Sequence, residues 1–333
     1  GDIWMAMNKG ISVITPPGLN PYGEGDEKAS INARHYTTEA GLIDNSVNCI
    51  LVDSRDRVWC GTRGGVSLML GEDAFVNYNE YDGLINNEVQ TIIESSDGLI
   101  WFGTLGGLAK TDLASMTTYD EVEGLFEKKI YCLAEDVKGN IWIGTFGGGL
   151  YKLDVHSEDT LPISFIADDS LLSSNNVYSL IFQDDQTLLV GTDKGIDKLR
   201  LDGNQNILGV KRYDKSDGYI GVENNLNANY KDKRGNIWLG TVKGVTRYDP
   251  SVERMSKNAP RTHITGIQMF FEDVDWSVRS DSLYPWLKLP RIMELGYSDN
   301  HLTFSYTGIS LTNPDKVMFK FKLDGLENDW SPP

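Results

Sequence analysis

The chain has 333 residues, of which 40% are hydrophobic and 24% are charged, a composition typical of a folded globular protein rather than a disordered one. Its length predicts about two domains. The formal net charge of -17 disfavours binding to a nucleic-acid phosphate backbone, and the sequence has no apolar run of the roughly eighteen residues that a membrane-spanning helix needs.

A short string built around tryptophan recurs along the chain. Its fullest form is Ile-Trp-x-Gly-Thr, followed by glycines and a leucine, as in residues 141–150. In chain order, the copies place one repeat column at Trp4, Trp59, Trp101, Trp142, Leu189 and Trp238. A regular recurrence of this kind indicates a repeat architecture.

A second string, Gly-Leu-x-x-Asn-x-Val, precedes the tryptophan string in residues 41–47 and 83–89, and in shortened form in 124–130, 175–177 and 223–226. Each unit therefore holds four stretches of strand length. The first stretch ends in an aromatic residue, and turn residues at 56–57, 97–98, 139–140 and 235–236 predict hairpins between the second and third stretches. Four strands in about 40–50 residues are typical of a β-propeller blade. No unit shows the apolar spacing of a helical solenoid.

Antiparallel strands place alternate loops on opposite faces of a propeller. We expect one face to carry the Gly-Leu-x-x-Asn-x-Val loops together with the Thr-x-Gly-Gly loops. Side chains on this face differ between repeats, and their amide, phenol, guanidinium and aromatic groups match paired hydroxyls and the apolar faces of sugars. The predicted ligand-binding residues are Asn48, Arg63, Gln90, Tyr131, Phe146, Tyr178, Lys194 and Asn227. The alternative is a solvated rim whose side chains merely differ from one repeat to the next.

No pattern in the sequence predicts a metal site, a cofactor or a catalytic centre. Cys49 and Cys132 share a repeat column that asks only for a small side chain, and Cys60 lies in an apolar column. The four histidines lack metal-ligand or triad spacing, and the glycine strings lead into strands rather than into a phosphate-binding helix. We therefore expect no cofactor, no metal and no enzymatic activity.

The Asn-x-Val, Gly-Asn-Ile-Trp-Ile-Gly-Thr and Gly-Gly-Leu strings, over about residues 1–250, resemble the two-component regulator propeller repeat. The resemblance implies a seven-bladed propeller in the periplasmic sensor half of a hybrid two-component histidine kinase, a family that responds to saccharides derived from polysaccharides. In that family a β-sandwich named for three tyrosines (Y_Y_Y type) follows the propeller. A membrane helix, a kinase core, a receiver and a DNA-binding domain come after it.

The last part of the chain fits that order. Alternating residues predict strands at 263–271, 302–306 and 317–323. Residues 319–331 are similar to the family string Tyr-x-Tyr-x-Leu-x-Gly-x-x-x-x-Trp, with Phe319 and Phe321 in place of tyrosines. We predict an all-β chain with propeller repeats in residues 1–258, comprising five full blades and a partial one, and an incomplete Ig-like β-sandwich in residues 259–333. Because an unclosed propeller exposes sheet edges, we expect further blades upstream.

The resemblance and the varied rim together predict a ligand-sensing module on the periplasmic side of the inner membrane. It would bind an oligosaccharide or another small polar ligand on the loop-bearing face and signal through the sandwich. A second propeller or a homodimer partner is a further candidate occupant, and we expect no direct contact of this part with nucleic acid or membrane. The alternative function is a cell-surface propeller that docks proteins without signalling. A glycosidase would need two opposed carboxylates that the sequence does not specify.

Overall fold

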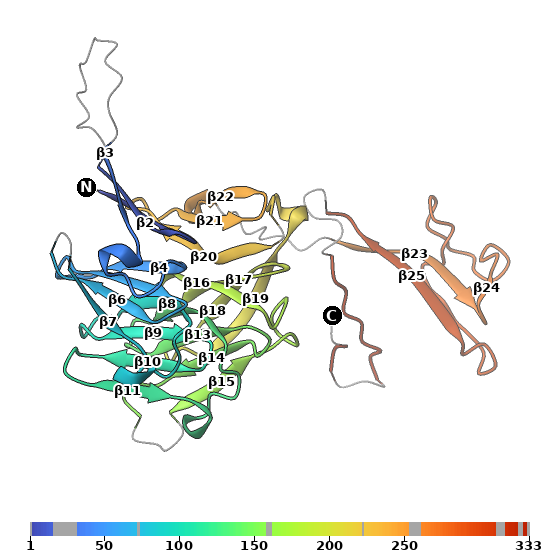
Figure 1. Cartoon of the computed structure of the whole chain (residues 1–333). Helices are drawn as coiled ribbons and strands as arrows, with labels where there is room; N and C mark the ends of the chain where they lie inside the picture. Colours follow the sequence, from blue (N-terminus) through green and yellow to red (C-terminus); the bar gives the residue numbers. More distant parts are fainter. Residues whose placement is uncertain are drawn as a thin grey trace, which may run out of the picture. The chain divides into compact units, whose positions relative to one another are not determined.

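The structure is a computed structural model that describes residues 2–15, 32–71, 74–157, 162–221, 223–252, 261–310, 317–325 and 329–331. The chain forms two compact units, residues 1–252 (unit 1) and 253–333 (unit 2). The described secondary structure consists of β-strands and short 3-10 helices, so the all-β prediction is confirmed (Figure 1).

Unit 1 contains six antiparallel sheets in its described residues, which we number in chain order. Sheet 1 consists of β1 (Ile3–Met7), β2 (Gly10–Thr15) and β3 (Asn32–Tyr36). Sheet 2 consists of β4 (Val47–Val52), β5 (Val58–Thr62), β6 (Val66–Met69) and β7 (Phe75–Tyr78). Sheet 3 consists of β8 (Val89–Glu94), β9 (Ile100–Thr104), β10 (Leu108–Thr111) and β11 (Met116–Tyr119).

Sheet 4 consists of β12 (Ile130–Glu135), β13 (Ile141–Thr145), β14 (Leu150–Leu153) and β15 (Ile163–Ala167). Sheet 5 consists of β16 (Val177–Asp184), β17 (Thr187–Thr192), β18 (Gly195–Leu201) and β19 (Ile207–Tyr213). Sheet 6 consists of β20 (Asn224–Lys231), β21 (Ile237–Thr241) and β22 (Gly244–Tyr248). The 3-10 helices are η1 (Thr38–Ala40), η2 (Glu80–Asp82), η3 (Glu121–Glu123), η4 (Lys215–Asp217) and η5 (Pro250–Val252).

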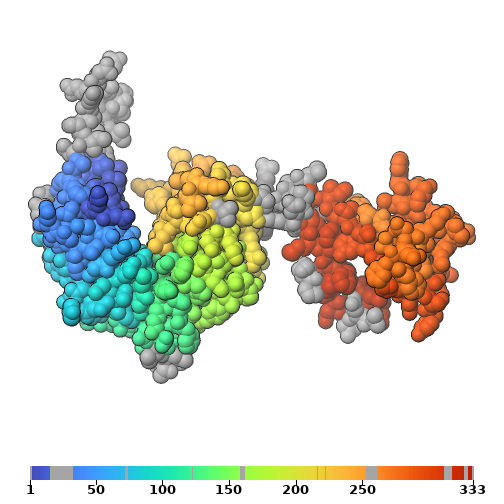
Figure 2. Space-filling model, turned by 45° about the vertical axis from the view of Figure 1, so that its right-hand side comes forward, coloured from blue at the N-terminus to red at the C-terminus, as the bar shows by residue number. Residues whose placement is uncertain are grey.

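The sheets are arranged like the blades of a propeller. The strands β4, β8, β12, β16 and β20, which open sheets 2 to 6, pack against one another in succession. In Figure 2 the colours of unit 1 follow one another in sequence order, from blue through green to yellow. In the described residues four sheets have four strands, and sheets 1 and 6 have three. The predicted count of five full blades and a partial one is therefore not confirmed.

The Gly-Thr string forms the turn between the second and third strands of a complete sheet. The Oγ1 atom of Thr62 donates to the carbonyl of Gly65 at 2.8 Å, and Thr104 donates to Gly107 at 2.7 Å. These two glycines have φ of 137° and 140°, and a Cβ at Gly65 would lie 2.3 Å from the carbonyl oxygen of Tyr78. The turn therefore explains why threonine and glycine recur, since other residues rarely adopt such φ values.

The hairpin between the first and second strands is built on a carboxylate that the sequence analysis did not identify. In sheet 4, Asp136 Oδ1 accepts from the backbone N–H groups of Lys138 and Asn140 at 2.8 and 3.0 Å, and Oδ2 accepts from Trp142 Nε1 at 3.0 Å. The same tryptophan bond recurs from Trp59 to Asp53, from Trp101 to the Ser95 hydroxyl and from Trp238 to Asp232. The recurring tryptophan thus holds the hairpin as well as the core.

The predicted turn residues of these hairpins do adopt positive φ. The values are 58° at Asp56, 82° at Gly98, 85° at Gly139 and 83° at Gly235. Aspartate tolerates this region better than most residues, and glycine enters it without steric cost. This part of the hairpin prediction is confirmed.

Tryptophan side chains form the contact between successive sheets. Trp59, Trp101 and Trp142 are at most 1% exposed. Trp59 lies 5.8 Å, between ring centroids, from Phe102 of the next sheet. The predicted small-residue column faces the glycine of the Gly-Thr string: a Cβ at Gly61 would lie 2.4 Å from Cys49 Sγ. Cysteine therefore stands in this column for its size, as the sequence predicted.

A second link joins neighbouring sheets at their hairpins. The backbone N–H and hydroxyl of Ser54 in sheet 2 donate to Glu94 of β8 at 2.7 and 2.6 Å. The same groups of Ser96 in sheet 3 donate to Glu135 of β12 at 2.8 and 2.6 Å. A glutamate at the end of one first strand thus caps the hairpin of the preceding sheet.

Unit 2 has one antiparallel sheet in its described residues, in the order β24–β23–β25. Its strands are β23 (Thr262–Met269), β24 (Glu272–Asp273) and β25 (Leu302–Gly308), which confirms the strands predicted at 263–271 and 302–306. Its small core contains Met269, Trp276 and Leu289.

The third strand predicted for unit 2 is absent, because residues 317–323 form no strand. The Phe319 ring lies 4.8 Å from the Tyr306 ring, so its aromatic packing does occur. A stretch becomes a strand only when a neighbour takes up its backbone hydrogen bonds, and alternation alone does not supply that neighbour. The Ig-like sandwich is not confirmed. The boundary predicted between residues 258 and 259 falls in 253–260, outside the described residues.

Candidate functional site

The two kinds of loop lie on the same face of unit 1, as the sequence predicted, and we call it the loop face. In four sheets, the residue after Gly-Thr donates its backbone N–H to the residue that precedes the first strand. These bonds run from Arg63 to Ser46, Leu105 to Glu88, Phe146 to Lys129 and Val242 to Glu223, at 2.9 to 3.2 Å. The varied side chains of both loops are thereby brought together.

Three of the predicted residues form an aromatic cluster on this face. Tyr131 of β12 lies 5.2 Å from Phe146 and 5.9 Å from Tyr178 of β16, measured between ring centroids. Phe146 is 38% exposed, and both tyrosines are partly exposed. The Nζ atom of Lys129 lies 5.7 Å from the Phe146 centroid. Partly exposed rings of this kind can cover the apolar face of a sugar, while the phenol hydroxyls offer hydrogen bonds.

Charged and amide groups border the aromatic cluster on the side of sheets 2 and 3. Arg63 Nε lies 3.7 Å from Glu88 Oε1, and Gln90 Nε2 donates to the same oxygen at 3.3 Å. Burial, followed by the negative charge of Glu88, raises the pKa of Tyr131 above its ordinary value. Glu88 therefore lies close enough to the cluster to affect the Tyr131 phenol. Because it also contacts Arg63 and Gln90, it links three of the predicted residues.

The two predicted asparagines use their amide nitrogens within the protein. Asn48 Nδ2 donates to the carbonyl of Val89 at 2.9 Å. Asn227 Nδ2 donates to the carbonyls of Tyr131 at 2.8 Å and Gln90 at 3.3 Å. Asn227 has a φ of 51°, and it lies where the register of β20 shifts. These bonds join first strands to one another.

The loop face also carries three carboxylates that are not among the predicted site residues, namely Glu88, Asp193 and Glu223. Burial, then the charges of Asp193 and Glu223, raise the pKa of Tyr178, so both lie close to the cluster. Asp193 Oδ2 accepts from Asn176 Nδ2 at 3.1 Å, and the predicted residue Lys194 beside it is exposed. Asp193 could have been found by its position, because it lies in the same column as Arg63 and Phe146. Glu88 and Glu223 lie directly before a first strand, in a column from which no residue was selected.

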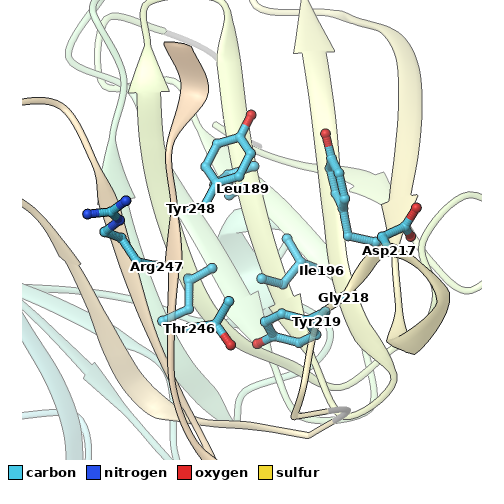
Figure 3. A pocket seen from close by; sticks show the side chains of 10 residues that line it. Leu189, Ile196, Asp217, Gly218, Tyr219, Thr246, Arg247 and Tyr248 are labelled. Carbon is cyan, nitrogen blue, oxygen red and sulfur yellow. The ribbon is translucent and has the colours of Figure 1, made fainter. Parts of the chain in front are cut away.

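A separate cavity of about 180 Å³ lies between sheets 5 and 6, lined by the rings of Tyr213, Tyr219 and Tyr248 (Figure 3). Leu189 stands here in the tryptophan column of the repeat. A Cβ at Gly218 would meet nothing within 4 Å, whereas one at the equivalent Gly124 would lie 2.4 Å from the carbonyl oxygen of Ile163 in the fourth strand of sheet 4. The cavity is therefore a result of packing, because Leu189 is smaller than tryptophan and sheet 6 has three strands in its described residues.

The cysteines have the environment of packed core residues. Burial raises the pKa of Cys60 to about 12 and that of Cys132 further still, so both thiols are neutral and weakly nucleophilic. Among the described residues, no three His, Cys, Asp or Glu side chains are grouped so as to hold a metal ion. In the same part of the chain, no helix has the length and apolar content to span a membrane.

Comparison with known proteins identifies the repeat. The model of the two component regulator propeller family matches residues 41–64, 83–106 and 124–147. These three segments run from the Gly-Leu-x-x-Asn-x-Val string to the Gly-Thr turn of sheets 2, 3 and 4. The chain therefore contains two-component regulator propeller repeats, as the sequence strings indicated.

The relatives are larger proteins. Histidine kinase P4 of Formosa agariphila is 23% identical over 157 residues, which make up 47% of this chain and 11% of that protein. The extracellular domain of a putative hybrid two component system from B. thetaiotaomicron superposes with a TM-score of 0.63 at 19% identity, over 99% of this chain and 48% of that one. PorZ, a surface component of the type-IX secretion system of Porphyromonas gingivalis, gives 0.54 at 14% identity, over 80% and 40%. The chain thus spans half or less of each relative, and the structural likenesses show a shared fold.

Proposed function

We propose that this chain is the extracytoplasmic ligand-sensing part of a hybrid two-component histidine kinase, located on the periplasmic side of the inner membrane. It binds a saccharide on the loop face and is not itself an enzyme. The propeller repeats and the likeness to the extracellular domain of a hybrid two-component system support the sensor assignment. Signalling would pass to unit 2, in the place where the family has its sandwich.

The observation that carries the proposal is the aromatic cluster of Tyr131, Phe146 and Tyr178. Rings left partly exposed on a soluble surface lose the favourable burial of about 25 cal/mol per Å² that a core would give them. Clustered exposed aromatic groups beside amides and charges are typical of ligand-binding surfaces. Saccharides offer both hydroxyl groups and apolar ring faces, which matches this combination.

The test is a screen of the purified chain against neutral, cationic and anionic oligosaccharides by thermal shift, followed by calorimetry. The Tyr131→Ala and Arg63→Ala variants should bind the best ligand at least about tenfold more weakly. Tyr230→Ala is the control, because Tyr230 is 60% exposed and lies beside the Asp232 hairpin, away from the loop face.

Unchanged affinity in both variants would remove the loop face from consideration. The bound oligosaccharide should be recovered intact after long incubation, and its cleavage would contradict the non-enzymatic assignment. Binding of a protein partner that depends on Tyr131, without binding of any saccharide, would support the docking alternative instead.

A further inference from the structure

The charged groups around the aromatic cluster indicate which class of saccharide would bind there. This inference rests on the proposed function. Three carboxylates from three sheets border the cluster. Glu88 precedes β8, Asp193 follows β17, and Glu223 precedes β20. Their charges contribute to the raised pKa values of Tyr131 and Tyr178, so negative potential reaches both phenols. The surface that would receive the sugar ring is therefore flanked by hydrogen-bond acceptors.

The carboxylate of Asp193 is only partly satisfied by hydrogen bonds. Its Oδ2 atom accepts from Asn176 Nδ2 at 3.1 Å, whereas its Oδ1 atom is buried and has no hydrogen-bond partner among the described residues. Leaving a buried charged acceptor unpaired costs folding free energy. The fold itself does not require a carboxylate here, because the same repeat column holds Arg63, Leu105, Phe146 and Val242 in other sheets.

The nearby cations differ in how they are placed. Arg63 faces Glu88 at 3.7 Å, and Lys194 is exposed beside Asp193. Lys129 holds its ammonium group 5.7 Å from the Phe146 centroid, so the cluster already accommodates one amine against a ring. An anionic sugar would bring its charge towards Asp193 and Glu223, whereas an amine would supply donors and the opposite charge.

We infer that the loop-face ligand is a saccharide carrying a protonated amine, such as a 2-amino-2-deoxyhexose unit. Its ring lies against Tyr131 and Tyr178, and its ammonium group pairs with the Asp193 carboxylate. A hydrogen bond between charged partners is roughly twice as strong as a neutral one. Saccharides with uronate or sulfate groups are disfavoured by the same carboxylates.

The experiment uses three β-1,4-linked trisaccharides of glucose configuration that differ only at C2. The chitosan trimer carries an ammonium group there, cellotriose a hydroxyl, and tri-N-acetylchitotriose an acetamide. Calorimetry on the full chain, at low salt and at a pH where the amine is protonated, should show the chitosan trimer binding about tenfold tighter than cellotriose. The advantage should shrink as salt is added.

Two isosteric variants localise the effect. Asp193→Asn should bring the affinities for the chitosan trimer and cellotriose to within about twofold of each other, with cellotriose binding little changed. Asp185→Asn removes the same charge from an exposed hairpin position after β16, at the far end of sheet 5, and should leave the preference intact. Melting curves confirm that both variants are folded.

The outcomes separate this inference from the proposed function. Equal or weaker binding of the chitosan trimer, or no binding of it at all, overturns the amine inference, as does a preference that survives Asp193→Asn. If cellotriose or the acetylated trimer then binds in a Tyr131-dependent way, the loop-face sensor proposal stands. If neither trisaccharide nor any other oligosaccharide depends on Tyr131, the proposed function fails as well.

Discussion

At the scale of single residues, the repeat is held by a few side chains that bond to backbone in sheet after sheet. Threonine closes the turn after the second strand, and aspartate closes the hairpin before it. The threonine could be predicted from the sequence because it belongs to a recurring string. The aspartate could not, because it stands six residues before its tryptophan, across the variable turn, and serine replaces it in sheet 3.

Asp232 offers a test through acid pH. Hydrogen bonds from the side chains of Asn236 and then Trp238 lower its pKa from 3.8 to about 2. A carboxylate with a depressed folded pKa stabilises the protein above its unfolded pKa, and that contribution is lost as the pH falls towards the folded value. The Asp232→Asn variant should therefore melt below the wild type at about pH 5, and the gap should narrow towards about pH 2. Calorimetric melting across this range checks it; a gap independent of pH would contradict it.

At the scale of the element, local sequence was sufficient for most of unit 1. Strands joined by short turns find their partners within about ten residues, so alternation and turn residues predicted them. The failure at residues 317–323 has a different cause: alternation predicted a strand, but these residues belong to no sheet of the described chain. The turn glycines are well explained, because the sequence predicts turns at their positions and their positive φ values show why glycine is needed.

Two glycines with positive φ provide a matched pair. Gly65 has a φ of 137°, and a Cβ there would lie 2.3 Å from the carbonyl oxygen of Tyr78, whereas Gly98 has a φ of 82° and open space around it. Gly98→Ala should cost about 1 kcal/mol of unfolding free energy, from backbone strain alone. Gly65→Ala should cost about 3 kcal/mol or more, because the turn must also move. Urea denaturation measures both, and equal costs would refute the steric account of the Gly-Gly string.

At the scale of the whole molecule, the contacts between sheets are the part of the structure that the sequence did not predict. Asn227 reaches the carbonyl of Tyr131, 96 residues away in the chain, and Ser96 reaches Glu135 across 39. The eight predicted site residues were chosen by column, and in four sheets backbone bonds bring the two kinds of loop together. Which of them touch each other depends on how neighbouring sheets meet, and one repeat read alone carries no such information.

The link between sheets 3 and 4 can be measured directly. A double-mutant cycle of Ser96→Ala with Glu135→Ala should give a coupling free energy of about 0.5–1.5 kcal/mol for the exposed, charge-assisted hydroxyl bond. Ser96→Ala removes this bond alone, whereas Glu135→Ala removes it together with the bond from the Ser96 backbone N–H. Ser54→Ala with Glu135→Ala is the matched control, since Ser54 bonds to Glu94 instead. That pair should be additive to within about 0.5 kcal/mol. Equal coupling in the two cycles would show that the link is not specific.

Phe146 belongs to the aromatic cluster and also connects two neighbouring sheets through its backbone. Its backbone N–H is tied to Lys129 in its own sheet, while it forms a β-bridge with Asn176, at the entrance to the next. A molecule seated on its ring would therefore lie at the junction of sheets 4 and 5.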